Sequence, residues 1–533
     1  MNIKIKDGFN PEKIKEKVIF TDISIDISSF TEEEKKIVAF LMQASDLIQE
    51  IFYLQKYKDN LLIKKEIEKI DIPYLKEYFT IMNGPFDAYN NNEPYIEEFN
   101  NKNIYDNEKA NFYPEDLSIE EWNDFLNNNP ELKDEFIFPY TIIVRENGKL
   151  KAVKYSDYYK EYLSKISELL FEASNYTNNF SLKSYLTSQA NAFLNNDFYE
   201  ADIRWLQIED SNIEPLLGAH EFYEDRFLGY KASFTAFISI IKKDENKKLE
   251  FIEKLLDKLQ SNLPLPDYCK KFKRGSQSQI KIVDLIYSSG DARGPFQTIA
   301  FNLPNSQKIK KEFGSKKVLL YNIIEAKFNN ILMPIARRVL TEKEILRLSF
   351  PANFNLILFH EISHELGISF IKDSDGTQRE VSYYLKELYP IIEETKADVM
   401  GIYLLSYFLK ECFISDCSIM EVCTTYIMGL LRSIRFGKEN VYCISSIIQW
   451  NFLKKEDVLI TLNNNKFSID LHKFEKTIEK LLNIILTLQK QGDYDKCDIF
   501  IKEYSKIESD LEIIINSLKD LPIDIYPSFK INM

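Results

Sequence analysis

The sequence is poor in histidine, glycine and cysteine, and each shortage excludes a class of site. Its 533 residues include four histidines, 15 glycines and six cysteines. It contains no GxxxxGK phosphate loop, no GxGxxG fingerprint and no GxSxG elbow, so nucleotide-binding and serine-hydrolase chemistry lack a motif. No CxxC pair occurs either. Cys412, Cys417 and Cys423 lie among apolar residues, which favours buried free thiols in a reducing cytosol, with redox or metal roles as the alternative.

Positive charge is also scarce, because 68 Lys and Arg face 82 Asp and Glu and the formal net charge is −14. Nucleic-acid binding needs a basic face that displaces phosphate counterions, so we expect neither that partner nor an anionic membrane. The chain begins without the apolar stretch of a signal peptide, and the apolar run at residues 399–409 is about half a bilayer span. We therefore expect a cytoplasmic protein whose acidic charge attracts cationic ligands, including peptides with a free amino end.

The length predicts more than one lobe, since 533 residues exceed one ordinary core and 45% of them are hydrophobic. Residues 136–154 are typical of a hairpin that turns at Asn147-Gly148. Strand signals return at residues 280–325, and helical patterns fill residues 326–517. The organisation is therefore mixed, with a strand-containing part followed by a helical one.

The clearest chemistry lies in one predicted helix over residues 353–367, which we expect to be capped by its first residue and ended by its last, a glycine. His360 and His364 are four residues apart, so a helix presents both imidazoles to one point. Glu361 projects beside them, where it can take a proton from a water at a metal ion. This HExxH pattern is typical of zinc hydrolases. The alternative is an amphipathic helix whose histidines are satisfied in a core.

Catalytic zinc needs a third protein ligand and an open position. A third histidine six residues after His364 is missing, because that position is Phe370. The two remaining histidines, His220 and His472, are remote in the sequence. The shortage of histidine therefore points to a carboxylate.

A second predicted helix, opening after Pro390, supplies such a carboxylate. Glu394 and Asp398 share one face with an alanine and Gly401, and these small residues would let the helix approach its partner closely. Burying unpaired carboxylates is costly, but a divalent cation and two imidazoles reverse that cost. We assign Glu394 as the third ligand, with Glu393 and Asp398 as acceptors for the ring N–H groups of the histidines. The alternative is that these acids are solvated surface groups.

HEISH followed about thirty residues later by EETKAD resembles the dipeptidyl peptidase III family of zinc peptidases, in particular a short bacterial branch with HExxH in place of HExxxH. AHEFYEDRFLGYK, from residue 219, resembles the family's E-x-Y-x-D segment, and RGPFQTIAFNLPN, from residue 293, its N-x-P-N segment. LRSIRFG at residues 431–437 and the tail LPIDIYP are similar to a related branch sometimes fused to a Nudix domain. No Nudix box occurs, so pyrophosphatase chemistry is not implied.

The resemblance implies roles for residues outside the two helices. Tyr223 would donate a hydrogen bond to the tetrahedral oxyanion. Glu221 and Asn305 would hold the amino terminus of the substrate, and Asn302 would contact the peptide backbone. Taken alone, Tyr223 would be a core-packing residue, so its catalytic role depends on the resemblance.

The resemblance also implies that Glu361 is the general base, and Glu394 matches the second Glu of the family's EExxAE/D motif. One departure concerns a histidine that related sequences carry shortly after the RFG segment, where it is thought to help stabilise the transition state. Here that stretch has no histidine, and Tyr442 aligns with it loosely. This departure leaves the catalytic efficiency open but not the metal site.

The family fold implies an α+β protein with two lobes around a wide cleft, a mostly α-helical zinc-binding lobe and a mixed lobe with a small β-barrel. We assign residues 1–240, 280–325 and 516–533 to the mixed lobe. Residues 241–279 and 326–515 form the helical, catalytic lobe in this assignment.

The combined interpretation is an exopeptidase with one zinc ion per chain, which releases dipeptides from the free N-terminus of short peptides. Two alternatives remain. One is another zinc hydrolase, such as a monoaminopeptidase or an endopeptidase. The other is a catalytically weak metal- and peptide-binding protein, which the missing histidine suggests.

Overall fold

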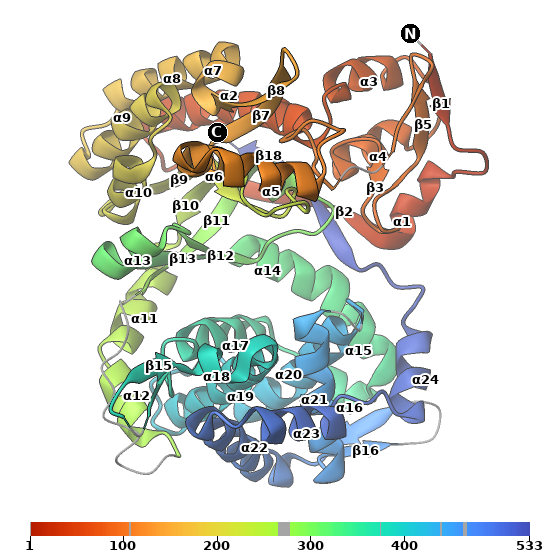
Figure 1. The fold of residues 1–533 in the computed structure, drawn as a ribbon. Helices are drawn as coiled ribbons and strands as arrows, with labels where there is room; N and C mark the ends of the chain where they lie inside the picture. The colour runs from red at the N-terminus through yellow and green to blue at the C-terminus, as the bar shows by residue number, and fades with distance from the viewer. Residues whose placement is uncertain are drawn as a thin grey trace. The chain divides into compact units, whose positions relative to one another are not determined.

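The structure is a computed structural model that describes residues 2–105, 108–264, 278–373, 375–437, 440–461 and 466–532. The chain divides into two compact units (Figure 1). The first unit comprises Met1–Lys243, Gln279–Ile323 and Tyr526–Met533, and the second comprises Asp244–Ser278 and Ile324–Ile525. Helices and antiparallel ladders both contribute to the fold, so the predicted α+β class is confirmed.

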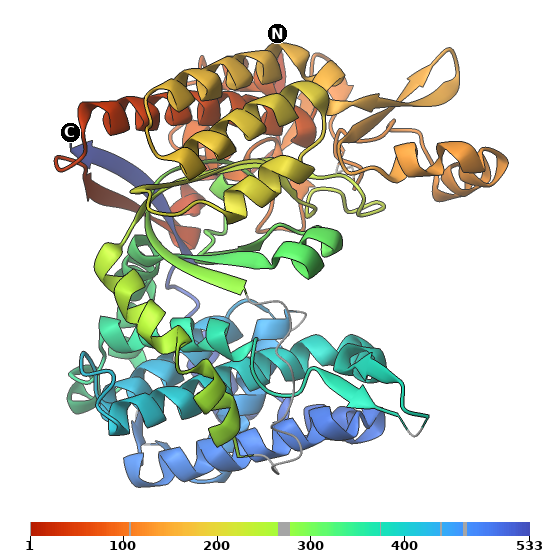
Figure 2. The same ribbon diagram turned by 90° about the vertical axis from the view of Figure 1, so that its left-hand side faces the viewer.

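A five-stranded sheet forms the centre of the first unit, with strand order β12-β13-β11-β10-β9. The strands are β9 (Ile213–Glu221), β10 (Ser233–Ile241), β11 (Ser278–Gly290), β12 (Ala300–Leu303) and β13 (Ser315–Leu320). The first eight residues of β9 and the first seven of β10 are buried, so these strands are covered on both faces. The helices α2 (Glu32–Lys56), α8 (Lys160–Asn175) and α9 (Phe180–Asn195) lie on one side of the sheet (Figure 2), with α2 packed against both β10 and α8.

The sheet curls so that its two edge strands approach each other. Asn305, just after β12, donates a hydrogen bond of 2.7 Å from Nδ2 to the carbonyl of His220 in β9. Phe301 of β12 stacks on Phe237 of β10 with ring centroids 4.4 Å apart. In the described part of the chain no ladder joins β9 to β12, so the small β-barrel expected from the resemblance is not formed. Backbone pairing stops here because β12 has four residues and Pro304 after it has no N–H to donate.

The hairpin predicted at residues 136–154 is confirmed for residues 141–154, whereas the first two residues of that range end the short helix α6 (Lys133–Ile137). It consists of β7 (Thr141–Glu146) and β8 (Lys149–Lys154), which pair antiparallel. Asn147 and Gly148 have φ of 51° and 79°. Positive φ at both central residues is the type I′ geometry that fits the twist of a two-residue hairpin.

The helix α2 is long and apolar enough to cross a membrane by length and composition, the one such helix among the described residues. Half of its most apolar window is buried inside the protein. Its start is fixed by a capping box, in which Thr31 and Glu34 each accept a hydrogen bond from the other's backbone N–H. In this structure α2 is a core helix of the first unit.

The second unit is almost wholly helical, as predicted for residues 326–517. Its central helices are α17 (Phe350–Ser363), α19 (Tyr389–Lys410), α20 (Ile419–Ile434), α21 (Val441–Lys455) and α22 (Leu471–Gln491). α19 packs against α17, α21 and α22 (Figure 1). This central position lets α19 collect side chains from three neighbours.

The cysteines in the described residues carry free thiols. Cys423 is buried as predicted, and Cys417 is partly buried. The prediction is wrong for Cys412, which is exposed because it lies in the turn after α19 ends. Cys269 lies outside the described residues.

Candidate metal centre

The helix that carries the HExxH motif begins earlier and ends earlier than predicted. α17 starts at Phe350, with the Ser349 hydroxyl as its cap and Pro351 in its first turn, where a missing N–H costs nothing. The regular helix ends at Ser363, His364 is its C-cap residue, and Gly367 follows at φ 93°. His364 keeps a helical φ of −62° and ψ of −26°. The four-residue geometry that aligns the two imidazoles is therefore retained.

The predicted close approach of the second helix is confirmed at Gly401. α19 begins at Tyr389 with Pro390 in its first turn. A Cβ atom at Gly401 would lie 2.9 Å from the backbone nitrogen of His360 and 3.0 Å from the carbonyl carbon of Phe359. Side chains essentially never come this close to a backbone, so this crossing of α17 and α19 requires glycine.

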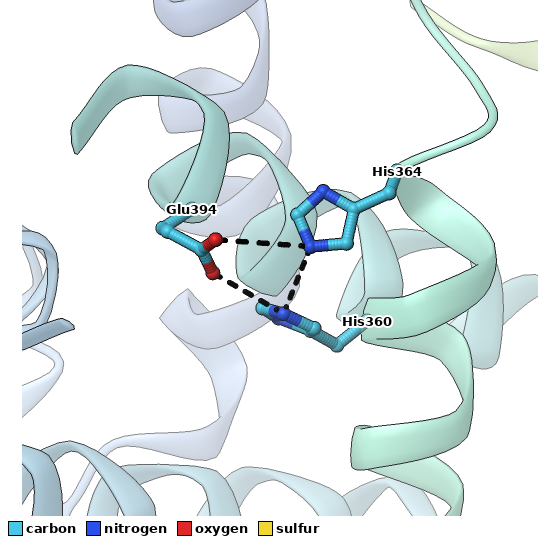
Figure 3. Close-up of side chains that lie close together, drawn as sticks. All are labelled: His360, His364 and Glu394. Carbon is cyan, nitrogen blue, oxygen red and sulfur yellow. Dashed lines mark hydrogen bonds and ion pairs between the residues drawn. The ribbon is translucent and has the colours of Figure 1, made fainter. Parts of the chain in front are cut away.

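This approach brings His360, His364 and Glu394 together (Figure 3). The Nε2 atoms of the two histidines are 3.2 Å apart. Glu394 places Oε2 3.3 Å from Nε2 of His360 and Oε1 3.9 Å from Nε2 of His364. One ligand atom from each residue lies within 4.8 Å of the others, so the three predicted ligands form a group that could hold a metal ion.

The other nitrogen of each imidazole faces a carboxylate, as predicted. Nδ1 of His360 lies 2.7 Å from Asp398 Oδ1, and Nδ1 of His364 lies 3.0 Å from Glu393 Oε1. Because a carboxylate accepts, each Nδ1 carries the hydrogen in the neutral ring, and each Nε2 presents a lone pair.

The three inward-facing groups fit a cation. With each Nδ1 directed at its carboxylate, the two Nε2 atoms lie 3.2 Å apart, and in the neutral rings both can offer a lone pair to a cation. Oε2 of Glu394 is buried and accepts no hydrogen bond from any described residue. A metal ion would satisfy all three groups at once, because deprotonated carboxylate and neutral imidazole are the states that ligate.

The carboxylates that face the histidines are themselves contacted by polar residues that were not predicted from the sequence. Gln449 of α21 donates to Asp398 at 2.8 Å, and Gln489 of α22 donates to Glu393 at 2.9 Å. The buried Lys396 forms an ion pair of 2.7 Å with Glu393. Lys396 belongs to the EETKAD segment and was open to prediction, but the glutamines come from distant helices and carry no sequence signal.

These partners decide the charge of Glu393. Burial by itself would raise the pKa of Glu393, but Lys396 and His364 outweigh it and lower the pKa to about 2. Lys396 also donates to the carbonyls of Ser363 and Leu366, at 2.8 and 3.0 Å, where the turns of α17 end. One lysine therefore ties the end of α17 to the carboxylate that orients His364.

Glu361 is partly buried and follows the first histidine of the motif on α17. Burial would lower the pKa of His360, but Asp398, Glu394 and Glu361 outweigh it and raise that pKa. Glu361 therefore lies within electrostatic reach of the proposed ligands. This placement is compatible with a base beside the metal.

The residues predicted to bind substrate lie in the first unit. Glu221 ends β9 and is partly buried, and burial raises its pKa. Tyr223, in the loop after β9, is 76% exposed. Asn302 and Asn305 are exposed, on β12 and just after it. The hydrogen bond from Asn305 to the carbonyl of His220 places the Asn305 amide at the peptide bond that leads into Glu221.

Two further acids, absent from the sequence prediction, surround Glu221. Burial, with repulsion from Glu224 and Glu221, raises the pKa of Asp291 to about 7, and Lys56 offsets part of this rise. Lys56 forms a 3.0 Å ion pair with Glu224. The cluster is a place where a bound cation would be stabilised. Asp291 follows β11 and belongs to no motif, so only the folded sheet connects it with Glu221.

Tyr442, which aligns with the missing histidine, lies in the first turn of α21 and is 52% exposed. Asn440 caps this helix by accepting from the backbone N–H of Tyr442 and of Cys443. Lys438 and Glu439, in the same stretch, lie outside the described residues.

Known proteins resemble this chain over nearly its whole length. Nudix hydrolase 3 of Arabidopsis thaliana is 30% identical over 555 residues, which cover 94% of this chain and 72% of that protein. The solved structure of DPP III from Caldithrix abyssi has 37% identity and a TM-score of 0.93, and the match covers 97% of this chain and 99% of that one. Dipeptidyl-peptidase III from Corallococcus sp. strain EGB has 28% identity and a TM-score of 0.80, over 99% and 98% of the two chains.

Residues 139–431 match the model of peptidase family M49. The matched range is more than half of the chain and contains both the HEISH and the EETKAD segments, whose side chains form the group described above. It also contains the central sheet of the first unit from β9 to β13. Since the motif, the matched range and the fold agree, the chain belongs to peptidase family M49.

Proposed function

We propose that this protein is a zinc-dependent dipeptidyl peptidase that removes dipeptides from the free amino end of short peptides. The observation that carries the proposal is the convergence of His360, His364 and Glu394, with Glu361 on α17, the helix that carries the two histidines. Membership of peptidase family M49 and the likeness to two solved dipeptidyl peptidase III structures support dipeptide release.

One zinc ion per chain is the proposed cofactor. Two imidazole nitrogens and one carboxylate oxygen are a donor set of catalytic zinc, which leaves a fourth position open. When bound, zinc supplies a lowered pKa for a water molecule and polarises the scissile carbonyl. The carboxylates of Asp398 and Glu393 hold the two imidazoles in the tautomer and orientation that ligation needs.

Glu361 is the proposed general base. It directly follows a ligating histidine on α17, its charge acts on His360, and it is not one of the three proposed ligands. Glu361 takes a proton from the attacking water and gives it to the leaving amine, a transfer worth about 10²–10⁴ in rate in comparable enzymes.

Substrate recognition is proposed for four residues of the first unit. Glu221 and Asn305 bind the substrate's terminal ammonium, and Asn302 binds the peptide backbone. The acidic surroundings of Glu221 support this assignment. Burial is the main reason that the pKa of Asp291 is raised, and a cationic group would relieve the repulsion from Glu224 and Glu221 that adds to it. Tyr223 donates its phenol hydrogen where negative charge develops, a contact worth about 3 kcal/mol in comparable sites.

The test is analysis of the products that the zinc-loaded protein releases from an unblocked pentapeptide. The same peptide with an acetylated amino terminus is the control. We expect the amino-terminal dipeptide as first product. Acetylation should lower kcat/KM by about 10- to 100-fold, since a charge-assisted hydrogen bond to the ammonium is worth about 1.5–3 kcal/mol. Release of single residues would identify a monoaminopeptidase, equal cleavage of both peptides an endopeptidase, and binding without turnover a peptide-binding protein.

A further inference from the structure

We propose that Asp225 and Lys231 are positioning residues for Tyr223, because they fix the loop at residues 222–232 that carries this tyrosine between β9 and β10. The inference rests on the proposed function, in which Tyr223 is a hydrogen-bond donor. It assigns a role to the last residue of the E-x-Y-x-D segment, for which the proposed mechanism has no use.

Asp225 organises the loop from inside. Its side chain is buried, with 3% of its surface exposed, and it accepts four hydrogen bonds. Oδ2 accepts from the Tyr113 hydroxyl at 2.7 Å and from the backbone N–H groups of Tyr230 and Lys231 at 2.8 and 2.9 Å. Oδ1 accepts from the N–H of Leu228 at 3.0 Å. Three of the four donors belong to the loop itself, so one carboxylate holds its turns together.

Lys231 anchors the end of the loop to a second element. Its side chain is fully buried, and Nζ donates to the carbonyls of Phe136 and Phe138 at 2.6 and 2.9 Å and to Oγ1 of Thr141 at 2.7 Å. The three acceptors use all three hydrogens of an ammonium group. They lie in the segment that enters β7, so the loop is tied to the hairpin as well as to itself. Burial lowers the pKa of Lys231 to about 7, and Asp225 opposes this shift.

Tyr113 contacts both the buried carboxylate of Asp225 and an apolar side chain of the loop. The rings of Tyr113 and Phe227 form a T-shaped pair with centroids 5.5 Å apart, and Nζ of Lys231 lies 6.0 Å from the Tyr113 ring centroid. Tyr113 is 4% exposed and lies outside the loop, in the chain before β7. The loop therefore has a buried polar anchor and a buried apolar one.

Tyr223 depends on this anchor more than on contacts of its own. It is 76% exposed, so packing of its ring contributes little to its position. A donor to a transition state has to be held within about 0.5 Å, and a displacement of 1 Å can cost about a hundredfold in rate. The buried network two residues further on, together with the ion pair of Lys56 and the adjacent Glu224, holds the backbone that carries Tyr223.

The experiment compares Asp225→Asn in two backgrounds of the full-length, zinc-loaded protein, wild type and Tyr223→Phe, with dipeptide release as the assay. Asparagine keeps the shape of the side chain but turns an amide N–H toward a backbone donor. We expect Asp225→Asn alone to lower kcat about 10- to 100-fold with KM changed less than about threefold. In the Tyr223→Phe background it should lower kcat further by less than about twofold, because both substitutions remove one function.

Equal effects of Asp225→Asn in both backgrounds would overturn the inference and leave the proposed function intact. A wild-type kcat in Tyr223→Phe would overturn the catalytic role of Tyr223 and the inference with it. Trypsin cleavage after Arg226, located by mass spectrometry, reports on the loop without reference to activity. We expect Asp225→Asn to be cut faster than the wild type, and unchanged resistance would refute the anchor.

A milder pair of variants covers the case in which Asp225→Asn does not fold. Tyr113→Phe removes one of the four hydrogen bonds to Asp225 and should lower kcat by a few fold with melting temperature and zinc content little changed. Tyr95→Phe is the matched control, since Tyr95 is equally buried and donates to a backbone carbonyl in another part of the first unit. The control should keep wild-type kcat. Equal losses in both variants, or none in Tyr113→Phe, would overturn the inference.

Discussion

Gly401→Ala tests whether the close crossing of α17 and α19 builds the metal centre. The added Cβ would lie 2.9 Å from the His360 nitrogen and 3.0 Å from the Phe359 carbonyl carbon, whereas ordinary contacts are 3.4–4 Å. The neighbours are backbone atoms of α17, so they cannot rotate away as a side chain would. The two helices have to separate by about 0.5–1 Å, and Glu394, two turns before Gly401 on the same helix, moves away from the histidines.

The magnitude follows from two opposing effects. Overpacking costs about 1–3 kcal/mol, and replacing a mid-helix glycine by alanine gains up to about 1 kcal/mol. Gly429, in the interior of α20, is the matched control, because a Cβ there has nothing within 4 Å. Gly429→Ala should therefore stabilise by about 0.4–1 kcal/mol. The two alanine variants should differ by about 1–3 kcal/mol.

Thermal unfolding and zinc affinity measured by competition with a chelator provide the assay. We expect Gly401→Ala to melt below Gly429→Ala and to bind zinc at least about tenfold more weakly, the lower end of what disturbed supporting contacts cost metal sites. Gly429→Ala should bind zinc like the wild type. The reasoning is refuted if both variants are stabilised and both keep the parental affinity, because the crossing would then tolerate a side chain.

Three other predictions address the base, the carboxylate behind a ligand and the acidic cluster. Glu361→Gln should keep stoichiometric zinc and lose at least about a hundredfold in kcat; metal analysis that finds the variant empty would give Glu361 a different role. Asp398→Asn should weaken zinc binding about 10- to 100-fold, and an unchanged dissociation constant would show that the contact to His360 is dispensable. Asp291 has a pKa of about 7 against an ordinary 3.8, so its proton stabilises the folded state below about pH 4, and this contribution is lost as pH rises through 7. When the pH is raised from about 5 to about 8, the melting temperature of Asp291→Asn should therefore fall less than that of the wild type. Equal decreases in the two proteins would contradict the raised pKa of Asp291.

Local rules were sufficient for several features. The four-residue spacing of His360 and His364 places two imidazoles on one face of any helix, wherever that helix begins. Pro390 marks the start of α19 because its missing N–H is harmless only in a first turn. Asn147-Gly148 predicts its hairpin because both residues tolerate positive φ. Each of these depends on neighbours within a few residues.

Some predictions were wrong where the sequence offers two competing signals. The cap of α17 is Ser349, because Pro351 suits the first turn and starts the helix before the predicted Asn353. The sheet of the first unit stays open in the described residues although its edges meet at Asn305, because side chains rather than a ladder bridge them. The strand pattern of the sequence is the same for an open sheet and a closed one.

By itself the sequence determined which side chains could ligate a metal, because their types and their spacing on two helices are local properties. Only the tertiary structure decided how those helices meet at Gly401 and which residues support the ligands from behind. Gln449 and Gln489 are 51 and 96 residues from the carboxylates to which they donate. Their roles arise from which faces of α21 and α22 pack on α19, and a face has many possible partners until the core forms.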